Sequence, residues 1–338
     1  MTAPPRAADH RAVGSPSPPT VAAIRAAIAP ILADLAATSR EREGSRDYPF
    51  GHVRALAAAG VLLIGIPEED GGAGGTLRDV VELIIELARA DSDVAQALRS
   101  SFGTANQVTA HSDLPRRERL LERLLQGNLF AGTVNERTGG ASGSVHATVR
   151  RDGDGYVLNG TKYYSTGGLY ADWFGGSAVD EDGRVVSFSV PTGRAGVELL
   201  DDFDAIGQRL TASGSTRLAG VRLAEHELVR QDRASLRNPW GSFGQLYLAC
   251  IEAGIAAAVL DEAIWFAREK ARPIKGGTAA KSTDDPYVRH VVGEIAARAH
   301  RYWRNARTVA NHNPRDWKAA VVGAYYLAGE EPPTSGLF

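Results

Sequence analysis

Apolar residues recur every three to four positions through the first third of the chain, which is typical of amphipathic helices. Thr20 is a suitable N-cap for the first helix, and Pro30 should kink it. Gly60 is placed to end the second helix, and Thr76 to cap the third. We expect helices over residues 20–35, 50–59, 76–90, 91–110 and 115–125.

At Phe130 the spacing of apolar residues changes from helical to alternating, and turn signals follow at short intervals. Asn159-Gly160 has the composition of a two-residue hairpin turn, and the β-branched and aromatic run Thr161 to Ser165 suits a strand after it. Other turns are expected at 152–155, 181–183 and 192–193. The pattern predicts a compact antiparallel β domain that ends near Leu228.

The helical spacing returns in an Ala-rich segment over 245–271, which Pro273 stops, and a last long helix is expected from near Tyr287. The predicted fold class is therefore α+β, with helices, then a sheet, then helices. We predict a disordered tail at 1–19, an N-terminal all-helical domain at 20–128, a central β domain at 129–230 and a C-terminal helical domain at 231–338.

Composition narrows the class of protein. The net charge of −2 comes without a sustained basic face, so we expect neither nucleic acid nor anionic membrane as a partner. The single cysteine, Cys250, lies in an apolar helical run and is expected to be buried, which fits a reducing cytoplasm. We find no secretory signal and expect no apolar run of the ~20 residues that span a bilayer. Gly71 to Gly75 lies before a helix, but it lacks a phosphate-binding motif and is expected to be a bare mobile loop.

Three ordered motifs carry a resemblance to the acyl-CoA dehydrogenase superfamily. The first is Phe130 to Glu136, which is followed by the small-residue loop 139–142. The second contains Lys162, Tyr164 and Thr166 and continues to Ala171-Asp172. The third is the run 207–214, with Val221 after it. The resemblance implies the same helix, sheet and helix organisation, a flavin cofactor and a homo-oligomer, a tetramer in the family.

The chemistry of the superfamily branches at one residue. Dehydrogenation of an acyl thioester needs a carboxylate base beside the flavin. The family places that glutamate either near the C-terminus, where this chain reads Trp303-Arg304-Asn305, or early in the first long helix of the back domain, where it reads Gly244-Gln245. Neither position offers a carboxylate. The run from Trp303 to His312 instead resembles the flavin-dependent monooxygenase branch.

That resemblance implies a reduced FMN supplied by a separate reductase, molecular oxygen as co-substrate, a flavin hydroperoxide, and oxygenation of a small molecule at a sulfur or nitrogen centre. FAD with a dehydrogenase activity is the alternative, and a catalytically inactive remnant or interaction subunit is a third. The implied catalytic residues are His312, Ser165, Thr166 and Asn135. The implied cofactor-binding residues are Thr133, Asn135, Tyr164, Ser165, Thr166, Arg272 and Lys270, with Arg272 matching an arginine contributed by a neighbouring subunit.

The sequence departs from the family in several places. Val309 stands where relatives can carry a second His, and Gln96, Ser100 and Ser101 stand where they can place His or Tyr towards the substrate. From the resemblance we expect that roughly 60 residues of the family pattern are absent before Trp303, about two helices of what should be a four-helix bundle. Such a loss would expose apolar faces unless a partner subunit covers them. We therefore expect an incomplete C-terminal domain.

Overall fold

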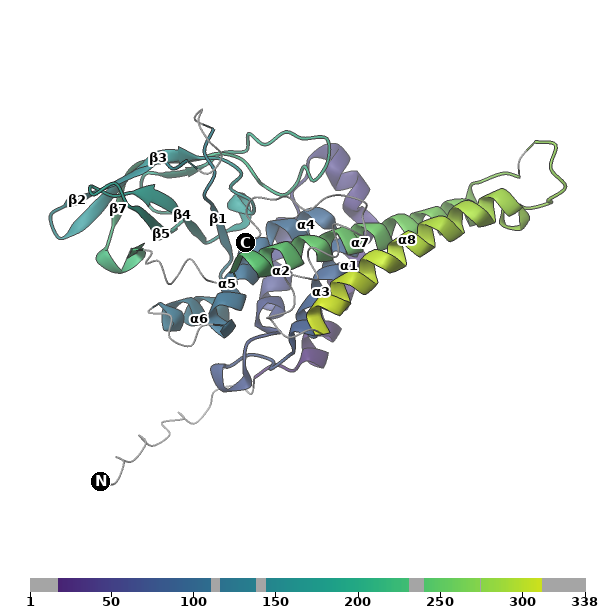
Figure 1. Ribbon diagram of the computed structural model, residues 1–338, viewed down its shortest axis with the longest axis horizontal. Helices are drawn as coiled ribbons and strands as arrows, with labels where there is room; N and C mark the ends of the chain where they lie inside the picture. The colour runs from purple at the N-terminus through teal and green to yellow at the C-terminus, as the bar shows by residue number, and fades with distance from the viewer. Residues whose placement is uncertain (1–17, 111–115, 138–143, 231–239, 274, 312–338) are drawn as a thin grey trace, which may run out of the picture.

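A computed structural model describes residues 18–110, 116–137, 144–230, 240–273 and 275–311. The order of elements is helices, then a sheet, then helices, as the sequence predicts (Figure 1). His312 and the predicted N-terminal tail up to residue 17 lie outside the described residues. The predicted domain boundaries stay predictions.

The N-terminal helices begin where the sequence signals place them. Thr20 accepts a hydrogen bond from the Ala23 N–H at 3.1 Å, and Thr76 forms a capping box with Asp79. The helices are α1 (Val21–Ser45), α2 (Phe50–Ala58), α3 (Leu77–Ala90), α4 (Ser92–Ala97), α5 (Arg99–Ala110) and α6 (Arg117–Leu125). The single helix expected over 91–110 is wrong, because the chain breaks it into α4 and α5 at Leu98. The first helix also runs ten residues further than its apolar spacing suggests, since its last turns are polar.

The central domain is one sheet of eight strands in the described residues. The order is β6-β7-β3-β2-β4-β5-β8, with β1 paired to β4. The strands are β1 (Phe130–Thr133), β2 (Thr148–Asp152), β3 (Gly155–Lys162), β4 (Trp173–Val179), β5 (Val185–Pro191), β6 (Val197–Leu199), β7 (Thr216–Leu223) and β8 (Leu228–Arg230). Five pairings are antiparallel, but β4 runs parallel to both β1 and β2. The expectation of an antiparallel domain is therefore incomplete.

The Asn159-Gly160 turn prediction is wrong. Both residues lie inside β3, whereas the turn predicted at 152–155 is confirmed as the β2–β3 hairpin turn, with a φ of 64° at Gly153. At Gly160 the pairing with β7 shifts register, and an added Cβ would lie 2.5 Å from that of Ala147. Gly160 thus permits a bulge opposite β7 and a close approach of β3 to Ala147, which are two other common roles of glycine within a strand. β3 then ends at Lys162 rather than at Ser165.

Two long helices follow the sheet, α7 (Trp240–Glu269) and α8 (Pro286–Asn311). They pack side by side as a hairpin whose tip projects far from the rest of the molecule (Figure 1). The first half of α7 lies against α3, where Tyr247 and Cys250 are fully buried. The burial of Cys250 is confirmed. Along its length the hairpin leaves large apolar side chains exposed, namely Ile255, Val259, Trp265, Phe266, Tyr287, Val291 and Tyr302.

By length and composition alone, α1 and the segment 243–269 of α7 are apolar enough to cross a membrane. The expectation that the chain has no such run is therefore wrong. Both segments are rich in alanine and contain a stretch with few charges, which raises their mean hydropathy. Each of these helices also buries part of its surface against α3. The core helix of a globular fold passes the same test.

The glycine-rich loop after η2 (Glu68–Asp70) is held by its own backbone hydrogen bonds. Its amides are engaged by the preceding backbone, with Gly74 N–H donating to Ile66 O at 2.9 Å and Gly75 N–H donating to Ile64 O at 2.8 Å. An added Cβ at Gly75 would lie 2.4 Å from Ile64 O, so the glycine permits this contact. Because these amides already have acceptors, the loop does not offer them to a phosphate.

Candidate functional site

Two loops of the sheet domain meet at the place where the sequence motifs predict a flavin. The loop after β1 and the loop after β3 are joined through Tyr163. Thr133 Oγ1 donates to Tyr163 O at 2.9 Å, and Tyr163 N–H donates to Asn135 O at 3.0 Å. The Asn135 N–H in turn donates to Thr133 Oγ1 at 3.0 Å. The structure therefore brings Thr133 and Asn135 beside the segment that holds Tyr164, Ser165 and Thr166.

A buried ion pair lies beneath this junction. Lys162 Nζ donates to Glu136 Oε1 at 2.5 Å, and both side chains are almost completely buried. Glu136 also accepts the N–H of His146 at 2.7 Å and of Ala147 at 3.0 Å. Burial works to raise the pKa of Glu136, but these donors outweigh it and hold that pKa below its usual value. The pair ties the loop after β1 to the ends of β3 and β2.

The two hydroxyls of the Ser165-Thr166 pair have different surroundings. Ser165 Oγ lies 2.7 Å from Thr216 Oγ1 in the interior, so it is already engaged within the sheet. Thr166 Oγ1 accepts from Ser213 Oγ at 3.0 Å, and its own nearest acceptor, Tyr164 O, is at 3.5 Å. A contact of that length is at the limit for a hydrogen bond. Thr166 is therefore the hydroxyl whose proton can turn to a ligand.

The backbone around this pair is unusual. Tyr164 has a φ of 57°, in the left-handed region that side chains other than glycine seldom adopt, and 51% of its surface is exposed. Gly167 has a φ of 81°, and an added Cβ would lie 2.3 Å from Ala97 O at the end of α4. The exposed ring of Tyr164 suits contact with a flat ligand, whereas Gly167 is buried and lets the segment pack closely on α4.

The third motif packs directly on the second. Ser165 N–H donates to Gly214 O at 3.0 Å, Gly167 N–H to Thr211 O at 2.9 Å and Gly168 N–H to Ala212 O at 3.1 Å. Thr211 Oγ1 and Ser213 Oγ lie 2.8 Å apart, which extends the hydroxyl series that ends at Thr166. We call residues 165–168 the shelf and residues 207–214 the support loop. These three backbone hydrogen bonds hold the shelf and the support loop together.

The remaining predicted residues lie elsewhere. Lys270 and Arg272 are exposed and follow directly after the end of α7 at Glu269, in the hairpin whose tip projects away from the sheet domain (Figure 1). Within one chain they do not join the site. Trp303, Arg304 and Asn305 lie in α8, while His312 is outside the described residues. Ser101, named as a substrate-facing position, is instead buried and bonds the backbone of Phe130 in both directions.

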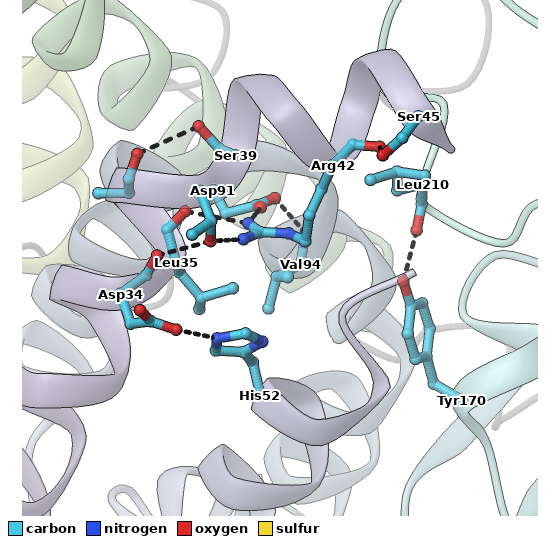
Figure 2. Close-up of polar contacts among 12 residues, drawn as sticks. Asp34, Leu35, Ser39, Arg42, Ser45, His52, Asp91, Val94, Tyr170 and Leu210 are labelled. Carbon is cyan, nitrogen blue, oxygen red and sulfur yellow. Dashed lines mark hydrogen bonds and ion pairs between the residues drawn. The ribbon is translucent and has the colours of Figure 1, made fainter. Parts of the chain in front are cut away.

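Sequence reasoning missed a buried polar cluster on the other side of the support loop. Arg42 of α1 pairs with Asp91 at 2.6 Å, with both side chains buried, and Asp93 lies in the same interior. Tyr170 donates its hydroxyl proton to Leu210 O at 2.8 Å. Figure 2 shows Arg42 and Asp91 on one side and Tyr170 with Leu210 on the other. The sequence signal for this cluster was the pair Asp91 and Asp93, which are separated by one residue and lie between helical runs of apolar residues.

A cleft of about 730 Å³ lies away from the shelf, between α6 and the sheet. Arg123 stacks on Trp173 there, and Arg194 pairs with Glu227. Because charges of both signs are paired with one another, the cleft shows no preference for an anion or a cation. Its size alone does not make it the functional site.

Comparisons with known proteins agree with the fold and the motifs. Residues 20–128 match the family Acyl-CoA dehydrogenase, N-terminal domain, and residues 131–221 match Acyl-CoA dehydrogenase, middle domain. The chain is 27% identical to dibenzothiophene monooxygenase from Rhodococcus erythropolis over 383 aligned positions, covering 88% of this chain and 91% of the relative. It is 29% identical to the probable FMNH2-dependent monooxygenase SfnC from Pseudomonas putida, and that match covers 94% of this chain and 79% of the relative.

Among solved structures, the chain resembles FMN-bound TdsC from Paenibacillus sp. A11-2. The TM-score is 0.81 at 27% identity, and the match covers 90% of this chain and 82% of that one.

Proposed function

The chain belongs to the acyl-CoA dehydrogenase superfamily, and from this premise we propose that it is a flavin-dependent monooxygenase. It would use reduced FMN and molecular oxygen to oxygenate a sulfur or nitrogen centre of a small organic molecule. The observation that carries the proposal is the shelf, where Thr166 keeps a hydroxyl proton for a ligand beside the exposed ring of Tyr164. The relatives named above, two of which carry FMN or FMNH2 in their names, support the choice of cofactor.

The residues present fit a flavin. Thr166 would donate to the ring system, Tyr164 would stack against it, and Thr133 and Asn135 would border it from the loop after β1. Arg272 and Lys270 would bind the phosphate from a second copy of the chain, because they lie far from the shelf of their own chain. His312 is proposed as the titratable group beside the flavin.

When bound, reduced FMN supplies the two electrons with which one atom of oxygen enters the substrate and the other leaves as water. The residues of the chain itself would orient the flavin and the substrate and enclose them. The Glu136–Lys162 pair fixes the loop that carries Asn135, and Ser213 of the support loop donates to Thr166 Oγ1, so the Thr166 proton points away from Ser213. A fixed donor needs no reorganisation during the reaction, which is the main way that protein dipoles assist catalysis.

Dehydrogenation with FAD is the second candidate and has less support. Gly244-Gln245 at the start of α7 and Trp303 to Asn305 in α8 carry no carboxylate at the positions where the superfamily places its base. Without a base near the flavin, removal of an α proton has no acceptor. An inactive remnant is the third candidate.

We propose a homo-oligomer whose contact includes the α7–α8 hairpin. Its exposed apolar side chains, Trp265 and Phe266 among them, would be covered by a second copy.

The alignment with dibenzothiophene monooxygenase spans 383 positions, more than the 338 residues of this chain, which supports the proposal that this chain has lost residues that dibenzothiophene monooxygenase has. We further propose a cytoplasmic location and a separate flavin reductase as partner.

The test is a thermal melt with and without FMN, followed by turnover. Protein supplied with a flavin reductase, FMN, NADH and oxygen is given a panel of thioethers and amines, and products are identified by mass spectrometry. We expect FMN to raise the melting temperature by mass action and at least one sulfoxide or N-oxide to form. Absence of FMN binding at millimolar concentration refutes the proposal. Anaerobic bleaching of bound FAD by an acyl-CoA would favour the dehydrogenase.

A further inference from the structure

The junction between α4 and α5 lies directly against the shelf. An added Cβ on Gly167 would lie 2.3 Å from the carbonyl oxygen of Ala97, the last residue of α4. Ser101, in the first turn of α5, exchanges hydrogen bonds of 2.8 and 3.2 Å with the backbone of the first residue of β1. From α7, Tyr247 donates its hydroxyl proton to Ala95 O at 2.7 Å. The shelf, the sheet and α7 therefore all hold this junction, and side chains on it start from a fixed backbone.

Arg99 lies in this junction without a counter-ion. Its side chain is half-buried, yet it makes no hydrogen bond or ion pair with any residue that the structure describes. Burial lowers the pKa of the Arg99 guanidinium, and the Tyr247 hydroxyl works against that change. By contrast Arg42, which is buried in the same helical domain, has Asp91 at 2.6 Å. Removing a charge from water without a partner is unfavourable. An unpaired guanidinium beside the shelf therefore indicates that its anion comes from a ligand.

A second polar group of the junction also lacks a partner. Gln96 Oε1 is buried and makes no hydrogen bond within the described part of the chain. Leu98, which separates α4 from α5, keeps a right-handed helical backbone with φ −80° and ψ −3°. Gln96 and Arg99 are three residues apart, so they lie on the same side of the chain. The Gln96 amide has both an acceptor oxygen and an NH2 donor, and by turning about its last bond it can present either one to a ligand.

This side of the two helices is also the side that is partly open. The partly exposed positions recur at intervals of four residues and are Ser92, Gln96, Ser100 and Thr104. The residues between them are buried or, at Arg99, half-buried. Residues four apart on a helix form one stripe. The stripe begins beside the support loop, where the Gln208 amide donates to Ser92 O at 3.4 Å. A ligand on the shelf can therefore meet Gln96 and Arg99 from this side.

We propose that Arg99 binds an oxyanion of the substrate, a carboxylate or sulfonate on the same molecule whose sulfur or nitrogen is oxygenated, and that Gln96 supplies a second hydrogen bond to it. The inference rests on the proposed function, because it names the substrate class of that site. A planar guanidinium suits such an anion, since it donates two parallel hydrogen bonds. The anion is assigned to the substrate rather than to the FMN phosphate because the junction packs on Gly167, next to the Thr166 hydroxyl proposed to face the flavin ring.

The first experiment measures binding without turnover. Protein with oxidised FMN and no reductase is dialysed at constant ionic strength against two matched thioether pairs. These are (methylthio)acetate with (methylthio)acetamide, and (phenylthio)acetate with (phenylthio)acetamide. We expect the wild type to bind at least one acid about tenfold tighter than its amide, and Arg99→Met to lose that difference, because a hydrogen bond to a charged partner contributes that much. Arg99→Lys keeps the charge without the planar fork and should retain part of the difference.

The matched control is Arg116→Met. Arg116, directly before α6, is also half-buried, and its Nε has no hydrogen-bond partner among the described residues. This variant should keep the wild-type preference for the acid. If it loses the preference as Arg99→Met does, the effect belongs to the overall charge, and the inference is overturned. Equal affinity of the wild type for acid and amide, or binding of neither, overturns it as well.

Melting curves without substrate test whether Arg99 has a structural role instead. Arg99→Met should melt no lower than the wild type, because the guanidinium that it removes is half-buried without a partner. A clear loss of stability would mean that the guanidinium supports the fold, and it would overturn the inference.

Affinities for FMN and riboflavin decide which anion Arg99 binds. We expect Arg99→Met to bind both flavins within about twofold of the wild type, since distant substitutions change affinity little. Loss of FMN affinity with unchanged riboflavin affinity would assign the guanidinium to the phosphate and overturn the inference.

Turnover separates this inference from the proposed function. With reductase, NADH and oxygen, Arg99→Met should raise KM for the acids about tenfold at nearly unchanged kcat, because the lost contact is equally strong before and during the reaction. A fall in kcat alone would contradict a binding role. If the wild type binds the acids through Arg99 but oxygenates no member of the thioether and amine panel, the proposed function fails and the oxyanion site stands.

Discussion

The buried pair of Lys162 and Glu136 allows the sharpest stability prediction. Replacing Lys162 with Met keeps most of the side-chain volume but removes the partner of a carboxylate that is almost completely buried. Breaking a buried pair by removing one partner costs about 3 to 5 kcal/mol, because the remaining charge has lost its compensation. Here two backbone donors, His146 and Ala147, still stabilise Glu136, so the lower end of that range applies.

The assay is urea unfolding of Lys162→Met at pH 7, with flavin absent so that binding does not contribute. The double variant Lys162→Met with Glu136→Gln is the control, since it removes the charge as well as its partner. We expect the double variant to regain at least half of the lost free energy of unfolding. If Lys162→Met unfolds within about 1 kcal/mol of the wild type, the pair does not tie the loop to the sheet as described.

Three further predictions follow from the site. Thr166→Val should weaken FMN binding by about tenfold at nearly unchanged stability, as titration by flavin fluorescence would show, because the lost hydroxyl is the one with no close acceptor. Gly167→Ala should lower the free energy of unfolding by about 2 kcal/mol or more, measured in urea, since its added Cβ meets Ala97 O. Asp93→Asn should gain stability over the wild type as pH rises. The raised pKa of Asp93 means that the folded chain keeps a proton which the unfolded chain releases near pH 4, so wild-type stability falls between about pH 4 and pH 7 by at most about 4 kcal/mol. Melting curves that differ equally at pH 5 and pH 8 would contradict this.

Local signals predicted the helices well. Thr20 and Thr76 cap helices because their hydroxyls accept hydrogen bonds from nearby amides, and this depends on a few adjacent residues. Asn159-Gly160 misled because the same dipeptide suits a hairpin turn and a bulge, and only the partner strand β7 decides between them. The parallel pairing of β1 with β4 joins segments about 40 residues apart and has no local signal.

The same distinction applies to the site. The motifs grouped Thr133 and Asn135 with the segment after β3, and both residues bond to Tyr163 there, while their roles stay predictions. They did not separate Ser165 from Thr166, because the partner of Ser165 is Thr216 on another strand. Asp93 was missed for the same reason, since its raised pKa comes chiefly from burial, which only folding produces.

The central claim is that this chain delivers one oxygen atom to a substrate from reduced FMN and molecular oxygen. Turnover under ¹⁸O₂ with reductase, NADH and FMN, using the best substrate of the thioether and amine panel, tests it directly by mass spectrometry. The account predicts a product heavier by one ¹⁸O atom, with formation abolished when FMN is omitted and strongly reduced in Thr166→Val. A product without the label, or one formed equally without FMN, would contradict it.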